Sequence, residues 1–247
     1  MTEPQAPTPS PTHRPERPLL VVLSGAGMSA ESGIPTFRDA GGLWEGHRVE
    51  AVASPEAWAR DPGRVLRFYN LRREAAWQAQ PHLGHHILAR LEAAFRVVIL
   101  TQNVDALHER AGSSQVLHLH GELSKVRSTL NPRYIQEVGG AAIQLGDTCP
   151  QGAQLRPHIV WFGEDVPLYP QAAKLASQAD LFLVVGTSLQ VYPAAGLIDY
   201  VPAHSPIWLI DQKVPAVSRK GLRVLETSAS EGLSLLAKQL APELYVG

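Results

Sequence analysis

Glycines after one apolar run, and polar side chains after three others, are the residues of this chain best suited to chemistry. The run Leu19–Leu23 precedes Gly25–Ala30 (GAGMSA), which fits the pattern G-x-G-x-x-A. In its dinucleotide-binding form, the first glycine permits a tight turn and the second brings the backbone close to a pyrophosphate. The small third residue lets a helix pack on the strand. A tight strand–helix turn without a ligand is the alternative interpretation.

Polar groups follow the other apolar runs, at 97–100, 116–119 and 181–185. The segments that follow are TQNVD at 101–105, HGE at 120–122 and GTS at 186–188. Ligands of open α/β sheets bind beyond the carboxyl ends of the strands, so these segments are typical of an active-site rim. Histidine suits a general base at neutral pH, because its ordinary pKa is about 6.5. His120 and His118, which point to the same side of the strand, are the two candidates.

The segment after the glycines is not that of an ordinary dehydrogenase, which carries an acidic residue about 20 positions on. Here the chain continues as SGIPTFRD at 32–39 and GGLW at 41–44. A loop that closes over a dinucleotide suits an enzyme that breaks the nucleotide, because the reacting centre must be shielded from water. A surface loop anchored by Phe37 and Trp44 is the alternative.

Five segments in chain order resemble motifs of the sirtuin family, the NAD-dependent protein deacylases. They are GAGMSAESGIPTFRD at 25–39, TQNVD at 101–105, HLHGEL at 118–123, RPHIVWFGE at 156–164 and GTSLQVYPAA at 186–195. The resemblance runs from about Leu19 to the C-terminus. It implies that NAD is consumed as co-substrate, that acylated-lysine proteins or peptides are the substrates, and that nicotinamide and O-acyl-ADP-ribose are the products.

The expected elements agree with an α/β fold. Strands are predicted near 19–24, 96–100, 115–119, 157–162, 180–185, 206–210 and 222–225, and helices near 84–94, 104–111, 168–178 and 229–240. This alternation predicts a Rossmann-type, doubly wound parallel sheet. The resemblance implies a smaller lobe made of two insertions, about 40–83 and 121–156, with the large domain at about 19–39, 84–120 and 157–247. In the first insertion a helix is predicted from Asp61-Pro62 through Arg73; the second has few helix or strand signals.

Composition is that of a soluble globular protein. The chain has 247 residues, 45% hydrophobic and 18% charged, with net charge −1. There is no basic surplus, so we expect no nucleic-acid or membrane partner. No run approaches the roughly 18 apolar residues of a membrane span, and no signal peptide is evident. The proline-rich segment 1–18 is predicted to be a disordered tail. We expect a monomer in the cytoplasm.

The resemblance implies these roles at the reaction centre. His120 is the catalytic base, and Asn103 orients the ribose hydroxyls or a water. Asp105 recognises the nicotinamide carboxamide, although Asn103-Val104-Asp105 is also an ordinary helix N-cap sequence. Asp211 stands where relatives commonly carry Asn, so it can accept from a ribose hydroxyl but cannot donate. The residues expected to bind NAD are Gly25, Ala26, Gly27, Ser29, Ala30, Glu31, Ile34, Pro35, Thr36, Phe37, Arg38, Trp44, Gln102, Asn103, Val104, Asp105, Gly186, Thr187, Ser188, Asp211, Gln212, Lys213 and Ala229.

The preference for one acyl group over another on the substrate lysine is expected to depend on Ala53, Tyr69 and Arg72. Tyr69 and Arg72 are three residues apart, hence on one helix face. They resemble the sirtuin class that removes succinyl and malonyl groups, in which the arginine and tyrosine bind the terminal carboxylate and the alanine leaves room for the longer chain. A guanidinium matches a carboxylate bidentately, and acetyl should also fit. A solvated arginine-rich helix face is the alternative, since Arg64, Arg67 and Arg73 lie nearby.

Peptide recognition is expected at Val160, Trp161, Phe162, Gly163 and Glu164. This segment would pair with an extended substrate as an added strand. Trp161 or Phe162 could equally be a plain core residue.

Cysteine content departs from the family. Many sirtuins hold a structural zinc through two Cys-x-x-Cys pairs, but this chain has the single cysteine Cys149. A Cys₄ site cannot form within it, and His158 cannot replace the missing ligands. Ser128, Asn131 and Gly152 stand at the other ligand positions. We predict no zinc, and a lobe held by packing of residues such as Leu130, Tyr134, Ile135, Val138 and Ile143.

Two other functions stay open. An ADP-ribosyltransferase or NAD hydrolase on the same scaffold would cut NAD without an acyl-lysine. A non-catalytic NAD-binding module would bind the dinucleotide without turnover.

Overall fold

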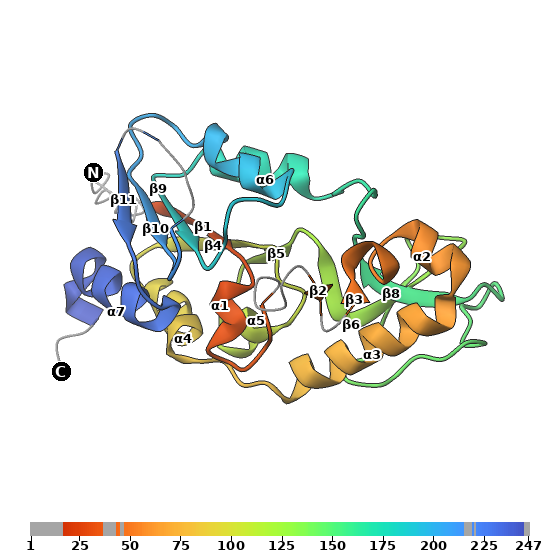
Figure 1. Ribbon diagram of the computed structural model, residues 1–247. Coiled ribbons are helices and arrows are strands. Elements are labelled where there is room, and N and C mark those ends of the chain that lie inside the picture. The colour runs from red at the N-terminus through yellow and green to blue at the C-terminus, as the bar shows by residue number, and fades with distance from the viewer. Residues whose placement is uncertain (1–16, 37–42, 45–46, 215–218, 220, 245–247) are drawn as a thin grey trace, which may run out of the picture.

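The computed structural model describes residues 17–36, 43–44, 47–214, 219 and 221–244, and for 43–44 and 47–49 it describes the backbone alone. A six-stranded parallel sheet forms the larger part (Figure 1). Its strands are β1 (Leu19–Ser24), β4 (Arg96–Thr101), β5 (Val116–His118), β9 (Leu181–Val185), β10 (Ile207–Ile210) and β11 (Leu222–Leu225). Their spatial order is β11-β10-β9-β1-β4-β5. The chain thus builds outward from β1 on one side and then from β9 on the other. This is the strand order of dinucleotide-binding folds, and it puts the ligand crevice where the order reverses, between β1 and β9.

Helices cover both faces of this sheet, as predicted for a doubly wound fold (Figure 1). Successive side chains of β1 point to opposite faces. Leu20 and Val22 pack in one core with helices α4 (Leu83–Leu91) and α7 (Ala229–Leu240). Leu19, Val21 and Leu23 pack in the other core with α6 (Tyr169–Ala176) and the 3₁₀ helix η2 (Ala194–Tyr200). Burial on both faces explains why β1 is a continuous apolar run.

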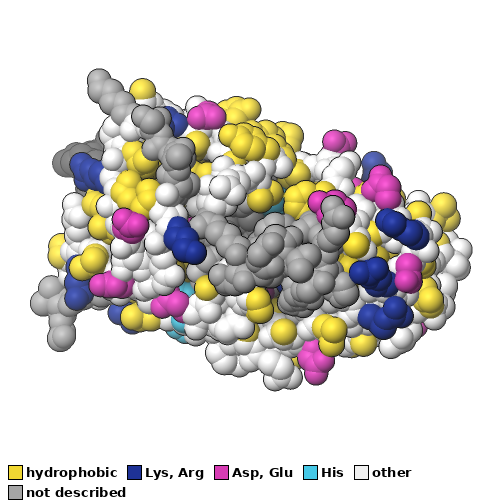
Figure 2. Space-filling model, in the orientation of Figure 1, with side chains coloured by type: hydrophobic (Ala, Val, Ile, Leu, Met, Phe, Trp, Pro, Cys, Tyr) yellow, Lys and Arg dark blue, Asp and Glu magenta, His cyan; other side chains and the backbone are white. Residues whose placement is uncertain are grey.

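A smaller lobe contains an antiparallel sheet in the order β7-β6-β8. Its strands are β6 (Gly121–Ser128), β7 (Ile135–Glu137) and β8 (Leu155–Ile159). Helix α3 (Pro62–Gln78) packs against β6 and β8, and α2 (Pro55–Arg60) packs against α3. The remaining elements are α1 (Gly27–Ala30), β2 (Leu43–Trp44), β3 (His47–Arg48), η1 (Val49–Ala51), α5 (Leu107–Arg110) and η3 (Pro242–Leu244). On the face seen in Figure 2, basic and acidic side chains of this lobe are intermixed.

Helix α3 begins where the sequence predicted. Asp61 Oδ1 accepts a hydrogen bond from Arg64 N at 2.9 Å, and Pro62 occupies the first helical position. A capping carboxylate and a proline at the first position are favoured at helix starts. The helix continues past Arg73 to Gln78.

Two predictions about the strands are wrong. The strand predicted near 157–162 for the parallel sheet spans Leu155–Ile159 and pairs antiparallel with β6. Pro157 lacks an N–H group, which suits an edge strand such as β8 rather than an inner one. The segment 121–156, predicted to carry few strand signals, contains β6 and β7. In β6 the pairing register shifts between Glu122 and Val126, so the two-residue period is interrupted.

No helix in the described ranges combines the length and apolar character that crossing a membrane requires.

Candidate active site

The turn after β1 lies against the loop after β9, at the point where the strand order reverses. Gly25 N donates to Val185 O at 3.1 Å, and Gly27 N donates to Gly186 O at 2.8 Å. A Cβ atom on Gly25 would come within 2.6 Å of Thr187 Cβ, and one on Gly27 within 2.8 Å of Gly186 Cα. Both glycines are therefore required by the close approach of the two loops. The predicted segments 25–27 and 186–187 meet at the carboxyl edge of the sheet.

Asn103 and Asp105 connect the loop after β4 to the same turn. Asn103 Nδ2 donates to Gly25 O and to Ser29 Oγ, both at 2.9 Å. Ser29 Oγ in turn donates to Asp105 Oδ2 at 2.9 Å. The amide hydrogens of Asn103 are used within the protein, so its Oδ1 is the atom it can offer to a ligand hydroxyl.

Asp105 also bonds to the start of the next helix, although the N-cap residue of α5 is Ala106 and not a residue of the predicted capping sequence. Its Oδ1 accepts from Leu107 N, the first residue of α5, at 3.1 Å. Burial raises the pKa of Asp105 above its ordinary value, although the bonds from Leu107 and Ser29 oppose the shift. The carboxyl group thus holds two parts of the chain together.

His120, two residues after the end of β5, contacts the loop after β4. Its Nδ1 lies 3.2 Å from Gln102 O, and Gln102 Nε2 donates to Thr187 Oγ1 at 3.0 Å. A carbonyl only accepts, so Nδ1 carries the hydrogen and Nε2 of the neutral ring keeps its lone pair. Burial lowers the pKa of His120, and the bond to Gln102 partly opposes this. This tautomer suits a proton acceptor.

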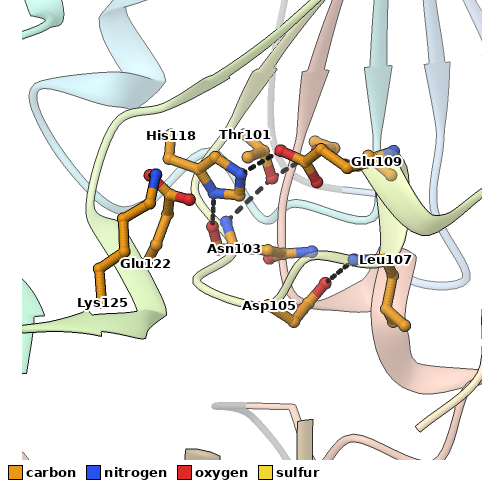
Figure 3. A network of polar contacts seen from close by, with 10 residues as sticks. Thr101, Asn103, Asp105, Leu107, Glu109, His118, Glu122 and Lys125 are labelled. Carbon is orange, nitrogen blue, oxygen red and sulfur yellow. Dashed lines mark hydrogen bonds and ion pairs between the residues drawn. The ribbon is translucent and has the colours of Figure 1, made fainter. Parts of the chain in front are cut away.

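His118 is not equivalent to His120 (Figure 3). Its Nδ1 lies 3.0 Å from Asn103 O and its Nε2 lies 2.7 Å from Glu109 Oε1. Both ring nitrogens are occupied, so His118 has no lone pair to offer a substrate. Glu109, on α5, was missed from the sequence because nothing local relates it to the strand that carries His118.

The sequence did not predict that the hydroxyl groups of Ser24 and Thr101, which end two strands of the sheet, would bond to each other. Ser24 and Thr101 are in-register last residues of β1 and β4. Ser24 Oγ donates to Thr101 Oγ1 at 2.8 Å and lies 3.0 Å from His108 Nε2. Thr101 Oγ1 accepts from Asn103 N at 3.0 Å. The sequence signal that could have predicted this contact is a hydroxyl residue at the end of each of two neighbouring strands.

The predicted acyl-binding residues lie in one buried cluster of the small lobe. Ala53, Tyr69 and Trp161 pack in it, and Arg72 is buried beside it, 8% exposed. The Tyr69 hydroxyl is buried without a hydrogen-bond partner among the described residues. Burial raises the pKa of Tyr69 above its ordinary value, and the charge of Arg72 opposes the shift.

A solvated arginine-rich face is not what α3 presents at this point. Arg73 is 1% exposed, and its Nε and Nη1 donate to Leu123 O and Asn70 Oδ1, both at 2.6 Å. Burial lowers the pKa of Arg73 to about 10. Arg64 and Arg67 are exposed. The alternative interpretation therefore fits those two and is wrong for Arg72 and Arg73.

The segment Val160–Glu164 follows β8. Of the two aromatic residues in this segment, Trp161 is buried in the core and Phe162 is 48% exposed. The Glu164 carboxylate accepts from Trp161 N at 2.8 Å and from Arg156, whose Nη1 and Nη2 lie 2.7 and 3.1 Å from it. Arg127 also donates to Glu164, at 3.0 Å. The Arg156 guanidinium stacks on the Trp161 ring, 3.2 Å from its centroid. These contacts fix Trp161 and Glu164 within the segment.

Comparison with known proteins decides the family. The model of the Sir2 family matches residues 25–193. The chain belongs to the Sir2 family. This confirms the resemblance to sirtuins that the sequence motifs indicated.

Curated Sir2 relatives cover most of the chain. The NAD-dependent protein deacylase of Bacteroides thetaiotaomicron is 53% identical over 229 residues, which cover 90% of this chain and 98% of the relative. A protein of the same name from Helicobacter pylori (strain J99) is 55% identical over 194 residues, covering 78% and 82%. Among solved structures, a Sir2 homologue–NAD complex has a TM-score of 0.83 at 39% identity, covering 93% of this chain and 91% of that one.

The other residues predicted to contact NAD in this Sir2 chain lie on several segments and differ in burial. Asp211 is buried after β10 and accepts from Lys213 N at 2.8 Å. Glu31 accepts from Ser230 N, next to the buried Ala229, at 2.9 Å. Phe37 and Arg38 lie outside the described residues, and for Trp44 only the backbone is described. Ala30, Pro35, Gln212 and Lys213 are exposed, and Ala26, Ile34, Thr36, Val104 and Ser188 are half-buried.

The zinc-ligand positions of other Sir2 proteins carry different contacts here. Ser128 Oγ accepts from Leu130 N and Asn131 N at 3.1 and 3.2 Å. Cys149 is buried in an apolar cluster with Leu66, Val126, Ile143 and Leu155, against which Tyr134 and Val138 pack. Leu130 and Ile135 are 71% and 46% exposed, so their predicted packing role is wrong. No group of three or more His, Cys, Asp or Glu side chains in the described ranges could hold a metal ion.

Proposed function

We propose that this chain is an NAD-dependent protein-lysine deacylase that removes succinyl, malonyl and acetyl groups. The observation that carries the proposal is the 3.2 Å contact between His120 Nδ1 and Gln102 O, because a carbonyl only accepts and Nε2 of the neutral ring is then left as a proton acceptor. The products would be nicotinamide and O-acyl-ADP-ribose. The curated relatives named NAD-dependent protein deacylase support the same reaction class.

The residues at the switch point fit NAD. The turn at Gly25 and Gly27 packs against the loop after β9 too closely for side chains, as in a phosphate-binding turn, and Asn103 and Asp105 supply buried polar groups beside it. Asp211 would accept from a ribose hydroxyl. When bound, NAD would supply a ribose that loses nicotinamide and takes up the acyl group on one of its hydroxyl oxygens. Phe37 would shield the ribose from water and Arg38 would contact phosphate, roles that rest on the resemblance.

His120 would act at its Nε2 atom. A neutral ring can take a proton from a ribose hydroxyl there while Nδ1 stays bonded to Gln102 O. Asn103 would orient that hydroxyl or a water through Oδ1. Asp105 would bind the nicotinamide carboxamide. All three roles require the loop 102–105 to keep its shape.

The acyl group would lie against Ala53, Tyr69 and Arg72. The buried Tyr69 hydroxyl, without a partner among the described residues, can donate to a carboxylate oxygen. The Arg72 guanidinium provides the charge and the fork geometry that a terminal carboxylate matches. Succinyl and malonyl chains end in such a group, whereas acetyl would fill the site without this contact.

The peptide would lie along Val160–Glu164. The N–H groups of Val160 and Phe162 donate to His120 O at 2.9 Å and Ala53 O at 3.0 Å, and that of Glu164 donates to Trp161 O at 3.0 Å. A substrate strand would therefore use the carbonyl groups of this segment and Gly163 N. Recognition of backbone in this way tolerates varied flanking sequence.

Mass spectrometry of succinyl- and acetyl-lysine peptides with NAD tests the proposal. We expect His120→Tyr to abolish both reactions. We expect Arg72→Met to lower the succinyl-to-acetyl rate ratio at least about tenfold, because a charge-assisted contact is lost. Arg67→Met, an exposed arginine on the same helix, is the matched control. An unchanged ratio in Arg72→Met would refute the carboxylate assignment.

The same assay separates the alternatives. A deacylase forms O-acyl-ADP-ribose in proportion to the lysine released. A transferase or hydrolase would consume NAD without acyl-peptide, and a binding module would retain NAD unchanged.

A further inference from the structure

The ring of His118 joins three segments of the large domain (Figure 3). It is the last residue of β5 and is 7% exposed. Its Nδ1 lies 3.0 Å from the Asn103 carbonyl oxygen and its Nε2 lies 2.7 Å from Glu109 Oε1 on α5. The ring therefore fills the space between β5, the 102–105 loop and the helix that follows this loop.

The chemistry of these two partners fixes the charge of the ring. A neutral imidazole has one N–H group, whereas a backbone carbonyl and an ionised carboxylate can only accept. Glu109 is ionised at neutral pH. Burial is the largest single effect and tends to raise its pKa, but the hydrogen bond to His118, the charges of His118 and His108 and a backbone hydrogen bond together bring the pKa below its ordinary value. Both ring nitrogens must then carry hydrogen for both contacts to exist.

We propose that His118 is a positioning residue, held as an imidazolium whose two N–H groups fix the Asn103–Asp105 segment for NAD. The proposal deepens the function proposed above, because it takes this segment as the nicotinamide side of the site. Asn103 Nδ2 donates to Gly25 O, and the Asn103 carbonyl contacts His118 on β5. The segment therefore connects β5 to the turn at Gly25–Gly27. Losing one N–H of His118 would release either the Asn103 carbonyl or Glu109.

Other charged and titratable groups adjoin the ring, and their effects are unequal. Burial is the largest single effect and opposes the charge of His118, but the hydrogen bond to Glu109, the negative charges of Glu109 and Glu122 and the bond to Asn103 O together outweigh it, so the pKa of His118 lies above its ordinary value. Glu122 on β6 acts in the same direction but is already paired with Lys125 at 2.7 Å. The groups that face or adjoin His118 are Asp105 on the loop, His108 and Glu109 on α5, Glu122 and Lys125 on β6, and His120 on its own segment.

The sign of the pH effect follows from the raised pKa. The imidazolium and both of its bonds are fully present below the ordinary histidine value of about 6.5 and are lost as pH rises through the higher pKa of His118 in the folded protein. The segment should therefore be released as pH rises through that pKa.

Nitrogen-15 NMR of the histidine rings in the ligand-free protein tests the charge directly. We expect both nitrogens of His118 to be protonated at pH 7, and to titrate above the ordinary histidine value of about 6.5. The resonance is assigned by its loss in His118→Phe. A neutral His118 ring at pH 7 would overturn the proposal.

Calorimetric titration with NAD tests the positioning. In the wild type we expect the Kd for NAD to rise about tenfold across the His118 titration, as for the loss of one charge-assisted hydrogen bond. Glu109→Gln should bind NAD at neutral pH with no such rise, because its amide can donate to a neutral Nε2 while Nδ1 keeps its bond to Asn103. His118→Phe should bind weakly at every pH.

Two controls isolate the effect. Glu122→Gln removes a nearby negative charge that does not bond to the ring, and it should keep the wild-type rise in Kd. ADP-ribose, which lacks nicotinamide, should show a smaller rise than NAD. A wild-type Kd that is flat across the titration, or a rise in Glu109→Gln equal to that of the wild type, would overturn the proposal. NAD binding that follows the expected pattern without turnover of any acyl-peptide would refute the deacylase function alone.

Discussion

His118 and His120, two residues apart, each direct Nδ1 at a backbone carbonyl of one loop. His118 faces Asn103 O at 3.0 Å and His120 faces Gln102 O at 3.2 Å. The pKa of His118 is raised and that of His120 is lowered, because Glu109 lies against the first ring and no comparable anion outweighs burial for the second. Neighbouring histidines thus acquire opposite properties, one suited to hold a charge and one to accept a proton.

The fall of the deacylation rate at low pH should report the protonation of His120. Burial lowers its pKa and the bond to Gln102 only partly opposes this, so the neutral base persists below the ordinary value of 6.5. We expect kcat/KM to fall only as pH drops through this lowered value. His120→Tyr should lose at least about 100-fold in kcat, the usual contribution of a general base. The measurement is a pH–rate profile with saturating NAD.

The exposed histidine His86 provides the matched control for this profile. His86→Gln should keep the wild-type acid limb. An acid limb centred above 6.5, or turnover by His120→Tyr near the wild-type rate, would contradict the assignment.

Gly121 should tolerate no other residue. Its φ is +82°, and a Cβ atom there would lie 2.0 Å from His158 O. We expect Gly121→Ala to lower the free energy of unfolding by more than the roughly 1–3 kcal/mol of backbone strain alone. Urea unfolding measures the change. Gly152→Ala is the control, with φ of +79° and open space around the added atom. Equal losses in the two variants would mean that the contact with His158 is not limiting.

The Glu164 carboxylate should be required to keep Arg156 buried against Trp161. We expect Glu164→Gln to lose about 1–3 kcal/mol of stability, because the half-buried carboxylate is the charged partner of the Arg156 guanidinium. Arg127→Met, which removes the second cation, should cost less, because Arg156 keeps its two bonds to Glu164. Chemical unfolding at neutral pH compares the variants, and equal costs would argue against the Arg156 pair as the main clamp.

The pH dependence of stability provides an independent check on Glu164. Burial is the largest single effect and tends to raise its pKa, but the hydrogen bonds from Arg156 and Trp161 N and the charges of Arg156 and Arg127 together bring the pKa below its ordinary value of 4.5. The stabilisation is therefore present above 4.5 and is lost as pH falls through the folded value. Glu164→Gln should lack this part of the acid-induced loss.

Metal removal should leave the small lobe intact. Cys149 packs in an apolar cluster and Ser128 Oγ accepts two backbone hydrogens, so neither requires a metal. We expect dialysis against a chelator to leave Tm unchanged, and elemental analysis to find far less than one zinc per chain. A chelator-dependent fall in Tm would contradict this expectation.

Local signals predicted much of the architecture. The apolar runs gave the parallel strands, Asp61-Pro62 gave the start of α3, and Gly25 and Gly27 gave the turn at the switch point. Each of these depends on neighbours in sequence. Motif resemblance supplied what periodicity could not, including the choice of His120 over His118.

Long-range pairing explains the errors. Whether a strand joins the large or the small sheet depends on distant partners, and β8 was misassigned for this reason. The burial of Arg73 depends on the Leu123 carbonyl, 50 positions away in the chain. Glu109 and His118 come from a helix and a strand whose docking no local pattern encodes.

The parallel sheet ends at His118 in β5 and the antiparallel sheet begins at Gly121 in β6. Leu119 and His120 are thus the shorter of the two connections between these sheets, the longer one running from β8 to β9 through residues 160–180. A rotation of one lobe against the other would change the backbone torsions of this two-residue connection, and with them the direction in which the imidazole points.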